Sequence, residues 1–119
     1  MNIVYILRVI IFRIVKIIVK TLIVIDVQND FVTGSLGTPE AQAIIPNVRK
    51  KIAKYRERND KIIFTQDTHD SNYLETSEGK YLPVPHCIAG TDGWKIVDEL
   101  SNDEDIIVYK STFWYVHLH

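Results

Sequence analysis

The sequence has 119 residues, of which 46% are hydrophobic and 24% charged, and its net charge is −1. This length suits one small domain, and the composition excludes a disordered or collagen-like chain. The net charge argues against a nucleic-acid binder, and the single cysteine, Cys87, excludes an internal disulfide and fits a reducing, cytoplasmic location.

The first 20 residues differ in kind from the rest of the chain. They include 15 apolar residues and no acid, and their basic residues are Arg8, Arg13, Lys16 and Lys20. These charges interrupt the apolar run, so the block does not read as a transmembrane helix. A basic amphipathic helix on a membrane surface is one interpretation. The block is biased toward isoleucine and valine, and no linker separates it from the strand that follows. We therefore favour the interpretation that residues 1–20 are a non-native extension.

A strand and a helix are predicted next. The apolar run 22–25 is typical of a buried parallel strand, and Asp26 ends it. Residues 27–37 contain Asn, Asp and Gly and are predicted to form a loop. Thr38 and the proline after it mark a helix start, and apolar residues at three- and four-residue spacing extend this helix to about Asn59.

The remaining chain predicts two more strands, a loop and a short helix. The apolar runs 61–65 and 106–109 indicate strands, which end before Asp67 and Lys110. The polar stretch 68–80 has no hydrophobic period and is predicted as a long loop. Residues 90–100 are predicted to open with glycines and continue as a short helix.

Alternating strands and helices predict a parallel sheet with right-handed crossovers. In such sheets ligands bind beyond the carboxyl ends of the strands, where Asp26, Asp67 and Lys110 stand. Asp26 and Lys110 are expected to form a buried pair, in which the cation keeps the carboxylate ionised and able to accept a proton. The alternative is that each is an ordinary loop residue.

A second group of residues has the composition of a metal site. Asp67 and His69 stand two residues apart, so they share a face of an extended segment, and His86 completes the group. Glu75 or Glu78 is a candidate fourth ligand. Such a donor set suits zinc, with iron or manganese as alternatives. The competing interpretation is that Asp67 caps a turn and both histidines lie on the surface. We interpret Cys87 as a packing residue.

Four segments resemble the isochorismatase-like cysteine hydrolases, the family that contains nicotinamidases. They are TLIVIDVQNDF at 21–31, FTQDTH at 64–69, LPVPHCIAGTDG at 82–93 and VYKSTF at 108–113. The resemblance implies a three-layer α/β/α fold with a parallel sheet, and it identifies residues 21–113 as a partial hydrolase domain. It also implies a small-molecule amide substrate, nicotinamide, which is hydrolysed to nicotinate and ammonia. A homo-oligomer is compatible with it, and neither nucleic acid nor a membrane is an expected partner.

The resemblance also implies a role for each matching residue. Asp26 is the expected general base and Lys110 the expected support for the thiolate. The expected metal ligands, which hold the ring nitrogen of the substrate, are Asp67, His69, His86 and, in preference to Glu75, Glu78. Phe31 is expected to line the substrate pocket.

The sequence departs from the family pattern at both ends. The family's nucleophilic cysteine is expected beyond Lys110, no residue of this chain matches it, and residues 114–119 resemble nothing in the family. We therefore expect a fold truncated after its third strand and an inactive fragment. The alternatives are an isochorismatase, which needs no metal, another cysteine hydrolase, or a non-catalytic metal-binding or membrane-associated fragment.

Overall fold

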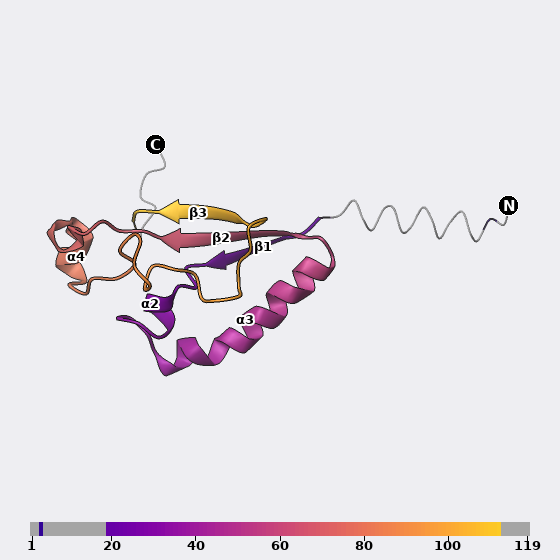
Figure 1. The fold of residues 1–119 in the computed structure, drawn as a ribbon, viewed down its shortest axis with the longest axis horizontal. Helices are drawn as coiled ribbons and strands as arrows, with labels where there is room; N and C mark the ends of the chain where they lie inside the picture. Colours follow the sequence, from indigo (N-terminus) through magenta and orange to yellow (C-terminus); the bar gives the residue numbers. More distant parts are fainter. Residues whose placement is uncertain (1–2, 4–18, 113–119) are drawn as a thin grey trace.

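The computed structural model describes Ile3 and residues 19–112, and these form a parallel α/β arrangement (Figure 1). The strands are β1 (Thr21–Ile25), β2 (Lys61–Asp67) and β3 (Ile106–Lys110), in one sheet of order β1-β2-β3. The connections contain the helices α2 (Asn29–Val32), α3 (Pro39–Glu57) and α4 (Ser77–Tyr81) and a 3-10 turn, η1 (Tyr73–Glu75). The predicted α/β class is thereby confirmed.

The two predicted terminal segments fall almost entirely outside the described residues. Of the block 1–20 only Ile3, Val19 and Lys20 are described, and of residues 114–119 none is. Within the part of the chain that is described, no helix is both long enough and apolar enough to cross a membrane.

Strand β2 pairs in parallel with both other strands and fixes the register of the sheet. Ile25 lies opposite Thr65, and Asp67 lies opposite Lys110. Strand β2 also continues through Asp67, two residues beyond its predicted end, because Gln66 and Asp67 pair with residues of β3. The carboxyl ends of the three strands therefore meet at one edge, as the sequence predicts.

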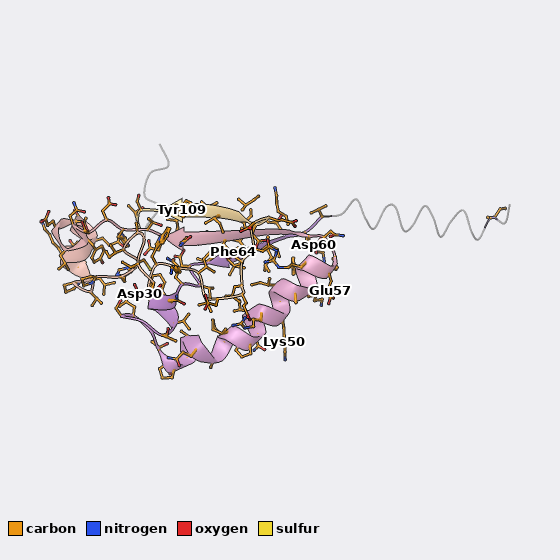
Figure 2. The ribbon with its side chains drawn as sticks, in the orientation of Figure 1. Asp30, Lys50, Glu57, Asp60, Phe64 and Tyr109 are labelled. Atoms are coloured by element: carbon orange, nitrogen blue, oxygen red, sulfur yellow. The ribbon has the colours of Figure 1, made fainter. Side chains whose placement is uncertain are left out.

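Helix α3 covers one face of the sheet and closes the core. It begins at the predicted place, where the Thr38 side chain accepts a hydrogen bond from the Ala41 N–H. Ile52 of α3 packs against Phe64 of β2, which lies on the α3 side of the sheet (Figure 2). The buried core consists of Val24, Ile52, Ile62, Phe64 and Leu100.

The opposite face of the sheet exposes apolar side chains. The exposed fractions are 55% for Ile23 and 66% for Ile25 in β1, and 46% for Val108 in β3. The sequence predicted a buried run at 22–25, but only Val24 of these residues is fully buried. The prediction fails because, among the described residues, the helix of the β1–β2 connection covers only one face of the sheet.

Two predicted loops contain short helices. The stretch 27–37 contains α2, and the stretch 68–80 contains η1 and α4. Helix α4 begins after Thr76, whose side chain accepts a hydrogen bond from the Gly79 N–H. Each of these helices has five residues or fewer, so neither displays the hydrophobic period by which longer helices are predicted.

The predicted helix at 90–100 is wrong. The segment forms turns with isolated local hydrogen bonds, and several of its backbone groups bond to the α2 region instead of forming a helix. The carbonyl groups of Lys95 and Gly93 accept from the N–H groups of Asn29 and Asp30, and the Val97 N–H donates to the Val27 carbonyl. Long-range pairing therefore occupies the groups that a local helix would use.

We predict that truncating isoleucines on the two faces of the sheet has unequal effects. Ile62→Ala should lower the free energy of unfolding by about 2–5 kcal/mol, because the side chain is buried in the core. Ile25→Ala should cost about 0.5 kcal/mol or less, since that side chain is mostly exposed. Guanidinium chloride unfolding followed by circular dichroism measures both values. Equal losses would contradict the assignment of the two faces.

Candidate functional site

Three of the predicted metal ligands lie together at the carboxyl end of β2. One ligand atom each of Asp67, His69 and His86 lies within 4.8 Å of the others. Asp67 Oδ2 is 2.9 Å from His69 Nε2 and 3.4 Å from His86 Nε2. All three side chains are buried, with exposed fractions of 0%, 6% and 1% for Asp67, His69 and His86. The competing interpretation, in which the histidines lie on the surface, is therefore wrong.

Backbone pairing brings the distant His86 to this edge of the sheet. The His69 N–H donates to the Cys87 carbonyl at 2.9 Å, and the Ala89 N–H donates to the His69 carbonyl at 2.8 Å. These bonds form a parallel bridge between His69 and Ile88. The segment that carries His86 thus runs alongside the chain that leaves β2.

Hydrogen bonding gives His86 the tautomer that a metal requires. Its Nδ1 lies 2.7 Å from the Val84 carbonyl oxygen, which only accepts, so Nδ1 carries the proton. In the neutral imidazole, Nε2 then presents a lone pair. His86 Nε2 and Asp67 Oδ1 are both buried and have no hydrogen-bond partner among the described residues. A lone pair and a carboxylate oxygen that are both unsatisfied in one buried cluster fit a bound cation.

Glu78 and Phe31 lie next to the cluster. Glu78 stands in the first turn of α4 and, with His69, lines a cavity of about 550 Å³. Its carboxylate is not among the atoms of the 4.8 Å group. Glu75, the other predicted candidate, is exposed in η1. The Phe31 ring is half-buried, and its centroid is 5.5 Å from that of His86.

The predicted acid–lysine pair is present at the same edge of the sheet. Lys110 Nζ donates to Asp26 Oδ2, and both side chains are largely shielded from solvent. The Thr65 hydroxyl donates to Asp26 Oδ1 at 2.6 Å. Asp26 itself has a φ of 51°, a left-handed conformation that few residues other than glycine adopt. Asp26 is therefore held from two neighbouring strands.

Two residues that support the cluster were not identified from the sequence. Gln28 is fully buried and clamps Asp67: its Oε1 accepts from the Asp67 N–H at 2.7 Å, and its Nε2 donates to the Asp67 carbonyl at 2.8 Å. Tyr73 packs its ring 4.7 Å from His69 and 4.9 Å from His86. Burial and the neighbouring carboxylates Glu78 and Asp67 raise the pKa of Tyr73. Gln28 stands between Val27 and Asn29, so its neighbours in the sequence do not mark it as a buried residue.

Cys87 has the environment of a packing residue. Its side chain is fully buried, and burial, followed by the nearby carboxylates Asp67, Asp30 and Asp26, raises the pKa of its thiol. A nucleophilic cysteine needs the thiolate, which this environment disfavours. The interpretation of Cys87 as a packing residue therefore agrees with the structure.

Comparison with known proteins identifies related sequences and folds. The family model described as the Isochorismatase domain matches residues 20–115. The nicotinamidase of Saccharomyces cerevisiae is 29% identical over 108 residues, and the match covers 68% of this chain and 50% of that protein.

Solved structures give the same picture. The pyrazinamidase of Pyrococcus horikoshii in complex with zinc is 34% identical, with a TM-score of 0.64, over 77% of this chain and 51% of that one. N-carbamoylsarcosine amidase from Thermoplasma acidophilum is 29% identical, with a TM-score of 0.68, over 78% of this chain and 52% of that one. The chain thus spans about half the length of these relatives.

We predict that the Cys87 thiol is unreactive in the folded protein. Each unit by which a pKa rises lowers the thiolate fraction about tenfold, so labelling with iodoacetamide at pH 8 should be much slower in the native protein than in guanidinium chloride. Stability should also fall as the pH rises above about 8.5, because the unfolded chain then releases the thiol proton more readily than the folded one. Native labelling at the unfolded rate would contradict this account.

Proposed function

This chain belongs to the isochorismatase family, and from that premise we propose that it carries part of the active site of a nicotinamidase-like amidohydrolase. The observation that carries the proposal is the buried Asp67–His69–His86 cluster, with its two unsatisfied ligand atoms. The similarity to a nicotinamidase and to a zinc-containing pyrazinamidase supports the same class of substrate, a small heteroaromatic amide.

Asp67, His69 and His86 would hold a divalent metal, with zinc preferred and iron or manganese as alternatives. Glu78 is our fourth candidate, because it lines the cavity beside His69 whereas Glu75 is exposed. When bound, the metal would supply a Lewis-acid contact for the ring nitrogen of nicotinamide. The chain's own contribution is to orient the ligands through Val84 and Gln28 and to exclude water from the cluster.

Asp26 and Lys110 would provide the proton transfer. The Asp26 carboxylate, which Thr65 and Lys110 hold by hydrogen bonds, would accept a proton from the nucleophilic thiol. The Lys110 ammonium would offset negative charge that develops during attack on the amide carbonyl. Phe31, whose ring adjoins His86, would form one wall of the substrate pocket.

We propose that the 119-residue chain does not hydrolyse nicotinamide by itself. Hydrolysis in this family needs a nucleophilic thiol, and the sequence contains one cysteine, Cys87, which is buried and has a raised pKa. Without a nucleophilic thiol, the rate of amide hydrolysis would be several orders of magnitude lower. The cytoplasmic location and the homo-oligomer stay predictions.

The alternatives differ in what the metal cluster would do. An isochorismatase needs no metal, so the cluster favours the nicotinamidase-like interpretation. Similarity to N-carbamoylsarcosine amidase keeps a different small amide as a second candidate. A non-catalytic metal-binding fragment would use the cluster without the Asp26–Lys110 pair. The zinc titration below tests the metal cluster, and the comparison of nicotinamide with benzamide tests the substrate class.

We predict that the chain binds one zinc ion and that the two histidines are ligands. In calorimetric titrations, His69→Ala and His86→Ala should each weaken zinc binding by more than the roughly 10- to 100-fold that loss of an outer-shell partner costs. Glu78→Ala should weaken binding less, and Glu75→Ala, the matched exposed control, should bind like the wild type. Circular dichroism checks that all variants fold. Wild-type affinity in both folded histidine variants would refute the site.

We also predict that the metal-loaded chain binds nicotinamide without hydrolysing it. Nicotinamide should change the visible absorption spectrum of the cobalt-substituted protein, whereas benzamide, which lacks the ring nitrogen, should not. Ammonia release should stay at the background rate. Equal spectral responses to both amides would contradict the proposed substrate class, and ammonia release that disappears in Cys87→Ala would contradict the role given to Cys87.

A further inference from the structure

Asp30 makes contacts that link α2 to the segment carrying His86. Its Oδ2 accepts a hydrogen bond of 2.8 Å from the Cys87 N–H, which lies 57 residues away in the sequence. Its Oδ1 is 3.4 Å from the Ser35 N–H. The backbone of Asp30 is fixed as well, since its N–H donates to the Gly93 carbonyl at 2.9 Å. Asp30 belongs to α2, which lies at the end of the molecule toward which the strands run (Figure 2).

The residue that Asp30 holds is in a strained conformation. Cys87 has a φ of 49°, in the left-handed region that residues with a side chain rarely adopt. Cys87 follows His86 directly, and its carbonyl accepts the bond from the His69 N–H. The Cys87 peptide therefore lies between two histidines of the cluster. A hydrogen bond to a carboxylate, which is stronger than one to a neutral acceptor, keeps this peptide in its unfavourable geometry.

The backbone leaves almost no room around the Asp30 carboxylate. A Cβ atom added at Gly93 would lie 2.1 Å from Asp30 Oδ2, and one added at Gly34 would lie 2.3 Å from Oδ1. Neither glycine has a positive φ, so they are required for space rather than for backbone freedom. The two glycine backbones therefore pack against the carboxylate, which lies within hydrogen-bond distance of the Cys87 N–H.

We propose that Asp30 is a positioning residue for the metal centre: through the Cys87 peptide it sets the direction of the His86 imidazole toward Asp67 and His69. This inference rests on the proposed function, because it assumes that the cluster binds a metal. Asp30 does not touch a ligand atom in this arrangement. It acts on the metal only through the backbone that carries His86.

The test compares zinc and cobalt binding in variants of Asp30 and of its surroundings. Asp30→Ala should weaken zinc binding about 10- to 100-fold, the range seen when an outer-shell partner is lost. It should also change the d–d absorption bands of the cobalt-bound protein, which report ligand geometry. Asp30→Asn, whose amide oxygen still accepts from the Cys87 N–H, should restore most of the affinity. Gly93→Ala should reproduce the loss by displacing the carboxylate.

Asp103→Ala, which removes an equally charged but exposed side chain, is the matched control and should leave the affinity and the spectrum unchanged. Guanidinium chloride unfolding of the metal-free proteins verifies the fold. Folded Asp30→Ala with wild-type affinity and spectrum would overturn the proposal. If Asp30→Ala does not fold, wild-type binding in folded Gly93→Ala would overturn it. Failure of the proposed function gives a different result: the wild-type chain would then bind no zinc, and the metal site and this inference would both be overturned.

Discussion

The parallel pairing of β2 with both neighbouring strands is the constraint on which the site depends. The register that places Phe64 in the core against α3 also places Asp67 opposite Lys110, at the end of the strand. Because side chains alternate between the faces of a sheet, a shift of β2 by one residue would expose Phe64 and turn Asp67 and His69 together away from His86. Core packing and site geometry therefore depend on the same register.

The cluster carries a cost that ordinary packing does not explain. A buried polar atom without a partner costs about 1–3 kcal/mol, and Asp67 Oδ1 and His86 Nε2 are two such atoms in the same cluster. The surrounding residues make the arrangement rigid, since Gln28 clamps the Asp67 backbone and the Val84 carbonyl fixes the His86 ring. Hydrogen-bonded partners of this kind orient the ligand side chains of metal sites.

Local sequence signals predicted the parts of the fold that local forces determine. The apolar runs located three strands, and Thr38 located the start of α3, because a strand pattern and a capping side chain act within a few residues. The family resemblance was confirmed by the match over residues 20–115. The structure also brings Asp67, His69 and His86 together, as their spacing and the resemblance indicated, although their roles stay predictions.

The failures have a common physical cause. The helix predicted at 90–100 is absent because its carbonyl groups bond to Asn29 and Asp30, more than 60 residues earlier in the chain. Gln28 and Asp30 also act through long-range contacts, so their supporting roles could not be predicted from neighbouring residues. The central claim is a nitrogen- and oxygen-ligated metal at the end of β2. X-ray absorption at the zinc edge of the zinc-loaded chain tests it most directly. We predict two imidazole ligands at about 2.0–2.1 Å and no sulfur ligand. A sulfur scatterer at about 2.3 Å, which would have to come from the single cysteine, Cys87, would contradict the account.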